Sequence, residues 1–129
     1  MPLATRPNAH YEHVLSADKD LPKKNRPIFI FRYLSLLDWE SVAALSEKLD
    51  ESTDSKQMTK WTIEIIGKTL VGWENLTDKE GKPVAFSKAK PMSFNIKQLK
   101  LLITIGEATE LMMAGVSQRP SADDLKKSE

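Results

Sequence analysis

The residues that come nearest to forming a catalytic or metal site are two histidines and two aspartates in the N-terminal part of the sequence. His10 and His13 lie three residues apart, and Asp18 and Asp20 follow them in a lysine-flanked segment. A zinc site needs three or four ligands in a fixed geometry, and Glu12 is the one further candidate nearby. Paired carboxylates could act as acid and base, but no apolar stretch beside them predicts a pocket. We therefore expect exposed histidines and a solvated turn, with no metal, no cofactor and no catalytic residue.

No other motif supplies enzyme chemistry. The chain has no cysteine, which excludes disulfides and thiolate sites, and it contains no phosphate-binding glycine loop or nucleophile elbow. Its most basic stretch, 19–32, includes aromatic residues and could bind single-stranded nucleic acid. The whole chain, however, balances 19 basic against 18 acidic residues, for a net charge of +1, so nucleic acid is an unfavoured partner. We expect a protein that is not an enzyme.

The N-terminal third predicts a pair of strands. Residues 1–11 have the composition of a flexible lead-in, a short first strand is expected within 12–16, and a second at 27–33, where aromatic and β-branched residues dominate. In the second strand Ile28 and Ile30 should face one way and Phe29 the other. A lone hairpin is marginal in water, so completion of the pair by another subunit is left open.

Two helices are expected next. Ser35 is a candidate N-cap for a helix over 36–49, and a second helix is expected over 53–71, ended by Gly72 in the left-handed conformation. Apolar residues recur at helical spacing in both segments, which predicts one buried face on each helix. The faces are Leu37, Val42, Leu45 and Leu49, with Trp39 and Ala43 beside them, and Met58, Trp61, Ile65, Ile66 and Leu70.

The segment 70–87 predicts an elbow, with a polar turn at 78–81 between two short apolar runs. A third helix is expected from about 93 to 114, with Ser93 or Asn95 as its cap, Gly106 in its interior and Gly115 after its last turn. Its predicted apolar face consists of Leu99, Leu102, Ile103, Ile105, Leu111 and Met112.

The polar segment 116–129 has the composition of a disordered tail. The prediction is a single domain over 12–115 that is mainly α (an α-rich α+β fold), with about three main helices and one or two short β-hairpins.

Five large side chains are candidates for contact with a protein partner: Trp61, Trp73, Phe86, Met112 and Met113. Tryptophan is enriched at binding hot spots, and methionine adapts its shape to varied apolar partners. For each of these residues, the alternative to partner contact is burial in the hydrophobic core. Trp61 is first interpreted as core, and Trp73 at the elbow is the stronger candidate for a shared contact.

The order of these signals resembles that of the tail assembly chaperones of long-tailed bacteriophages. The resemblance covers most of residues 12–115 and rests on turns and apolar anchors. The matching segments are VLSADKD (14–20), RPIFIFRYLS (26–35), the tryptophan-bearing helix, VGWENL (71–76), Asp78, Gly81-Lys82-Pro83 and Phe86-Ser87 before the last helix.

The resemblance implies a non-enzymatic protein of the host cytoplasm that binds the tail tape measure protein and is absent from the mature virion. The major tail tube protein is a second candidate partner. The first residues lack the apolar core of a signal peptide and no apolar run could span a bilayer, so no membrane partner is expected. Two alternatives stay open: a structural virion component, such as a head-to-tail or tail-terminus protein, and a small nucleic-acid-binding regulator. Self-association also stays open.

Overall fold

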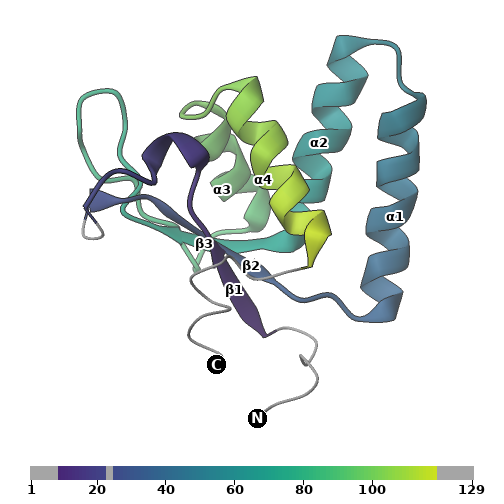
Figure 1. Ribbon diagram of the computed structural model, residues 1–129, viewed down its shortest axis with the longest axis horizontal. Coiled ribbons are helices and arrows are strands. Elements are labelled where there is room, and N and C mark those ends of the chain that lie inside the picture. Colours follow the sequence, from purple (N-terminus) through teal and green to yellow (C-terminus); the bar gives the residue numbers. More distant parts are fainter. Residues whose placement is uncertain (1–8, 23–24, 119–129) are drawn as a thin grey trace.

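The computed structural model describes residues 9–22 and 25–118. Its elements follow one another along the chain as shown in Figure 1: β1 (His10–His13), a 3-10 turn η1 (Ser16–Asp18), β2 (Ile28–Arg32), α1 (Leu36–Glu51), α2 (Ser55–Thr69), β3 (Leu70–Glu74), α3 (Met92–Lys100) and α4 (Ile105–Ser117). The helix-rich α+β class is confirmed. The described part contains four α-helices instead of about three, and one three-stranded sheet.

The sheet is antiparallel, with β2 between β1 and β3. Phe29 and Phe31 of β2 are fully buried beneath the helices, whereas Ile28 and Ile30 are half-buried on the opposite face, as the alternation predicts. The strand pair is completed by β3 of the same chain. The sheet therefore reaches three strands without a second subunit.

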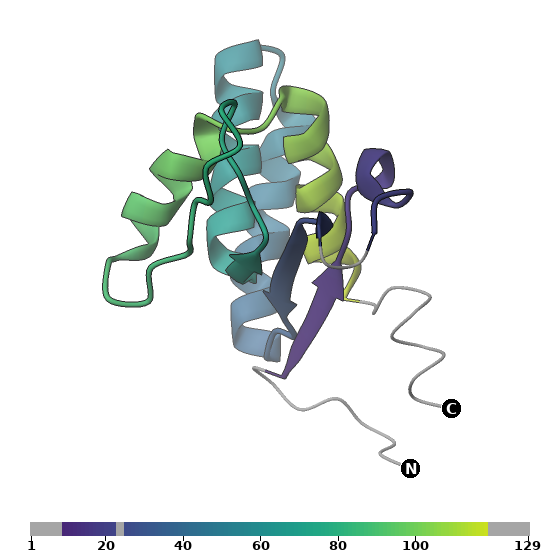
Figure 2. The ribbon, with the colours of Figure 1, turned by 90° about the vertical axis from the view of Figure 1, so that its left-hand side faces the viewer.

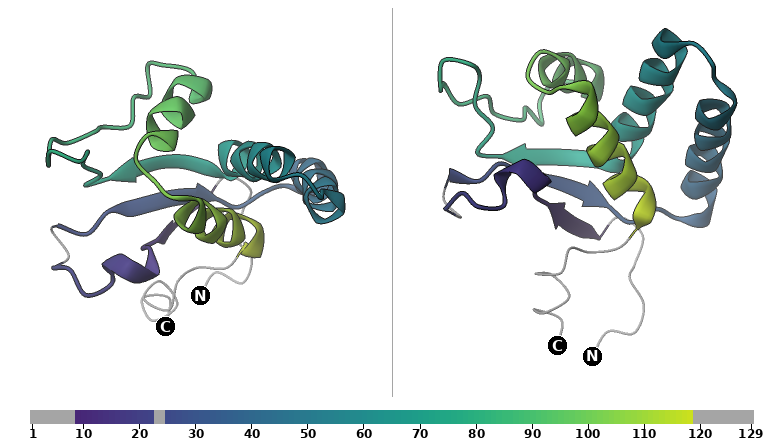
Figure 3. Two further views of the ribbon diagram at one scale, coloured as in Figure 1. Left: turned by 90° about the horizontal axis from the view of Figure 1, so that it is seen from above. Right: turned by 45° about the horizontal axis from the view of Figure 1, so that its top comes forward.

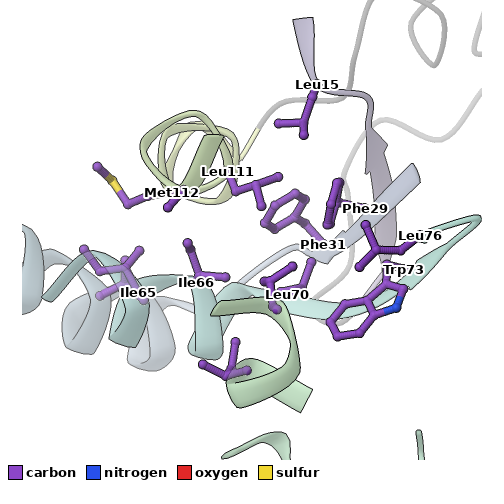
Figure 4. Packing of buried hydrophobic residues seen from close by; sticks show 14 of the residues in the cluster. Leu15, Phe29, Phe31, Ile65, Ile66, Leu70, Trp73, Leu76, Leu111 and Met112 are labelled. Carbon is purple, nitrogen blue, oxygen red and sulfur yellow. The ribbon is translucent and has the colours of Figure 1, made fainter. Parts of the chain in front are cut away.

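The helices form a layer organised around α2. Figure 2 shows α2 between α3 and α4, and Figure 1 shows α1 on the outside of α2. The top view in Figure 3 places β1 at the edge of the sheet farthest from α3. In Figure 4, Leu111 of α4 points toward Phe31 of β2, and Ile65 and Ile66 of α2 extend the same core.

The second predicted helix ends earlier than expected. Residues 70 and 71 belong to β3, since α2 stops at Thr69 and Leu70 takes extended dihedrals. Pairing with β2 satisfies the backbone groups that a longer helix would have satisfied internally. Gly72 lies inside β3, and the φ angle is positive at a single described glycine, Gly81 of the polar turn. The prediction of Gly72 as a left-handed helix stop is wrong.

The third predicted helix is two helices. α3 ends at Lys100, and α4 begins after Thr104, whose side chain accepts from the Glu107 amide while the Glu107 carboxylate accepts from the Thr104 amide. This capping box ends the continuity of the helix. Gly106 is therefore in the first turn of α4 and not in a helix interior, and the predicted place of Gly115 after the last turn is wrong because α4 continues to Ser117.

Several predicted faces and caps also differ. Leu37, Trp39, Met58 and Ile105 are exposed instead of buried. The third-helix caps were expected at Ser93 or Asn95, but α3 begins at Met92, and the buried Asn95 side chain binds both backbone groups of Ser87. That pair of hydrogen bonds ties the end of the elbow to α3.

The predicted limits of the domain shift at both ends. β1 occupies 10–13 instead of 12–16, so His10 and Tyr11 are strand residues and not part of a lead-in. The first two residues of the predicted tail belong to α4. Residues 1–8 and 119–129, where the rest of the lead-in and tail were expected, lie outside the described residues. Within the described ranges, no helix combines the length and apolar character needed to cross a bilayer.

Candidate functional site

Helices α2 and α4 meet closely at their C-terminal ends and separate toward their N-terminal ends. The close contact is at Gly115, where an added Cβ would lie 2.9 Å from Thr69 Cβ and 3.4 Å from the Phe31 ring. Figure 1 shows the two helices splaying apart from this contact. A groove of about 470 Å³ opens between the separated ends. We name it the α2/α4 groove.

The α2/α4 groove is lined by apolar and hydroxyl-bearing side chains from three helices and a turn. Its lining residues are Leu49 and Asp50 of α1, Ser52 of the following turn, Ser55, Met58, Thr59 and Thr62 of α2, and Ile105, Thr109 and Met112 of α4. Asp50 is the one ionisable side chain among these. The Thr59 and Thr109 hydroxyls donate to carbonyls of their own helices, at 2.9 Å each. The groove therefore presents little unsatisfied polarity.

Three large apolar side chains are left in solvent along this part of the surface. Met58 is 42% exposed, Ile105 61% and Met113 58%. Ile105, Thr109 and Met113 are spaced four residues apart, so they follow one face of α4 and extend the apolar strip past the groove. A continuous apolar strip of this kind, beside a groove, is typical of a protein contact site.

Trp73 and Phe86 of the predicted elbow are used inside the fold. Trp73 is 5% exposed, and its Nε1 donates to the Val84 carbonyl oxygen at 2.7 Å. The half-buried Phe86 packs edge-on against Trp73, with 5.1 Å between ring centroids. A hollow of about 650 Å³ lies beside them, lined partly by the 75–86 segment. The elbow is thus anchored to the core through Trp73.

Of the other three candidates for partner contact, the two methionines lie at the α2/α4 groove and Trp61 lies away from it. Met112 is buried at the α2/α4 groove and Met113 is exposed beside it, so the structure brings these two candidates together. Trp61 is half-buried, with the ammonium groups of Lys48 and Lys60 each 4.9 Å from its ring. Trp61 lines neither hollow.

Ile105 is the residue that sequence reasoning missed as part of an exposed site. A Thr-x-x-Glu capping box precedes it at 104–107, and this pattern marks a helix start. The prediction of one long helix over 93–114 places Ile105 in the middle of that helix, on its buried face. If the 104–107 pattern is interpreted as a helix start, Ile105 is predicted in the first turn of a helix.

His13 is half-buried instead of exposed. Its Nε2 lies 2.7 Å from Glu110 Oε2, which also accepts from the Ser16 amide at 2.9 Å. Burial alone would raise the pKa of Glu110, but these hydrogen bonds outweigh it and hold that pKa below its ordinary value. Burial raises the pKa of Asp18, and Glu107 and Glu110 raise it further. The hydrogen bonds of Glu110 hold the 13–16 segment against α4.

His10 points the other way from β1 and is exposed, as expected for a strand residue of the opposite face. Across 9–22 and 25–118 there is no group of three or more histidine or carboxylate side chains that could hold a metal ion.

Comparison with known proteins adds no relative. A scan against protein-family models finds no match, and searches of curated proteins and of solved structures find none either. The likeness to tail assembly chaperones therefore rests on the sequence segments named above, and the surface to be explained is the α2/α4 groove.

Proposed function

We propose that this chain is a phage tail assembly chaperone that binds the tail tape measure protein through the α2/α4 groove. The observation that carries the proposal is a solvent-open groove walled by the exposed Met58 and Ile105, with almost no charge in its lining. Such a groove fits the apolar stripe of an amphipathic helix. A tape measure protein is a long, helix-rich chain whose apolar stripes need cover until the tail is built.

The proposed protein is non-enzymatic, acts in the host cytoplasm and leaves before the virion is complete. The major tail tube protein is the second candidate partner, since it must also be delivered to the growing tail. Met113 lies next to the groove on the same exposed face of α4, so a bound helix longer than the groove would contact it. We expect Trp73 to act indirectly, by holding the elbow in place.

Co-expression with the tape measure protein and affinity capture test the proposal. Met58→Glu and Ile105→Glu each place a carboxylate where an apolar stripe would be buried, at a cost of several kcal/mol without a partner charge. We expect each variant to weaken capture at least tenfold. Leu36→Glu is the matched control, because Leu36 is an exposed leucine on α1 that does not line the groove. It should capture the partner like the parent chain.

Mass spectrometry of purified virions separates the proposal from its nearest alternative. A chaperone is recovered with the tape measure protein and is missing from the particle. Presence in the particle at fixed copy number would identify a structural component instead. Capture that the two groove variants leave unchanged would remove the groove from the mechanism.

A further inference from the structure

The outer edge of β1 presents unpaired backbone groups. The Tyr33 amide donates to the Ala9 carbonyl oxygen at 2.8 Å, and the strand register then makes Tyr11 and His13 the residues that bond to β2. His10 and Glu12 alternate with them, so their N–H and C=O groups point away from the sheet. Within the described ranges no hydrogen bond reaches these groups. An edge of this kind is a template for another strand.

The edge is held rigidly in place. The Tyr11 hydroxyl donates to the Ala114 carbonyl oxygen at 2.7 Å, and its ring packs on Phe31 and Tyr33, with centroids 5.7 Å and 4.7 Å away. The His13–Glu110 contact fixes the end of the strand. A pre-ordered edge loses little conformational entropy when a second strand joins it.

The sequence of β1 is complementary to itself in one antiparallel register. If two copies pair with Tyr11 opposite Tyr11, His10 of each copy faces Glu12 of the other. In this register His10 of one copy and Glu12 of the other form the hydrogen-bonded pairs of the antiparallel ladder. The N–H and C=O groups of these two residues are the ones that point outward from β1. A register centred on Glu12 or on His10 would instead oppose like residues. Hydrogen bonding permits all three registers, and the charges of the opposed side chains select the one centred on Tyr11.

We propose that two copies of this chain associate through β1 in this register, which joins their sheets into one six-stranded antiparallel sheet. Histidine opposite glutamate is favourable as an imidazole hydrogen bond or as an ion pair. No residue of β1 lines the α2/α4 groove, so the proposed dimer does not depend on the function proposed above.

Sedimentation equilibrium tests the dimer. A short edge-to-edge interface is weak among protein dimers, so the protein concentration should reach about 1 mM. We expect the parent chain to dimerise and Glu12→Lys to weaken the association about tenfold or more, because both imidazole–carboxylate pairs of the dimer are lost. The double variant His10→Glu with Glu12→Lys restores opposite charges and should restore the dimer.

A second variant separates strand pairing from charge. Glu12→Pro removes an amide that points outward, so it leaves the hydrogen bonds between β1 and β2 in place while removing two from the dimer. It should give a folded monomer by circular dichroism and sedimentation. A parent chain that stays monomeric throughout the concentration range overturns the proposal. A dimer that neither Glu12 variant weakens also overturns it, since the contact then lies elsewhere.

Discussion

At the scale of single residues, Gly115 permits the closest approach of two helices. An alanine there would place its methyl group against Thr69, which is fully buried and bonded to the Ile65 carbonyl oxygen at 3.0 Å. We expect Gly115→Ala to lower the free energy of unfolding by about 1–3 kcal/mol, because the crowding outweighs the gain in helix propensity. Urea denaturation measures the change.

The matched control is Gly72→Ala in β3. There an added Cβ would meet the Phe86 ring at 3.8 Å, an ordinary contact distance. The variant should therefore stay within about 1 kcal/mol of the parent chain. If Gly115→Ala were as stable as Gly72→Ala, the helices would not be as tightly packed at Gly115 as described.

A second residue-scale prediction concerns Glu110. Its pKa is lower in the folded chain than its ordinary value of 4.5, so its carboxylate adds stability above that pH, and the contribution is lost as the pH falls through the folded value. We expect Glu110→Gln to be less stable at pH 7 by about 1 kcal/mol, with a smaller difference in stability at a pH well below 4.5. Thermal unfolding at both pH values measures this. The exposed Glu64→Gln is the control, and an equal gap at both pH values would contradict the prediction.

At the scale of elements, the start of α4 decides where the α2/α4 groove begins. Thr104→Ala removes the hydroxyl that accepts from the Glu107 amide in the capping box. We expect the free energy of unfolding to fall by about 1 kcal/mol. Amide hydrogen exchange should quicken most at Glu107 and Ala108, whose amides donate to the Thr104 hydroxyl and carbonyl oxygens. Thr53→Ala is a suitable control, since Thr53 is exposed and Asp54, not Thr53, caps α2. Equal effects of the two substitutions would mean that the box does not set the helix start.

At the scale of the whole molecule, the helices do not share the core equally. α1 packs mainly on α2, with Val42 and Leu45 as its buried residues, while α2 is surrounded by three other helices. Local opening costs least where the fewest apolar contacts are lost. We expect amides in the middle of α1 to exchange at least tenfold faster than those around Ile65. Equal rates would mean that both helices open only when the whole chain unfolds.

Much of the local structure could be predicted from the sequence. Ser35 caps α1 through the Asp38 amide, Phe29 alternates into the core, and Gly81 takes the positive φ of the polar turn. Each depends on a side chain acting within a few residues of itself, through a cap, a two-residue period or a permitted dihedral. These are the features that a sequence determines by itself.

Tertiary structure decided the rest. Residues 70–73 are a short apolar run that suits a helix end or a strand, and only the presence of β2 beside them selects the strand. Trp73 and Met113 are both large and apolar, yet one is buried by the elbow and the other faces solvent. The α2/α4 groove exists because two helices cross closely at Gly115 and diverge beyond it. Such features depend on contacts between distant parts of the chain, which spacing along the sequence does not encode.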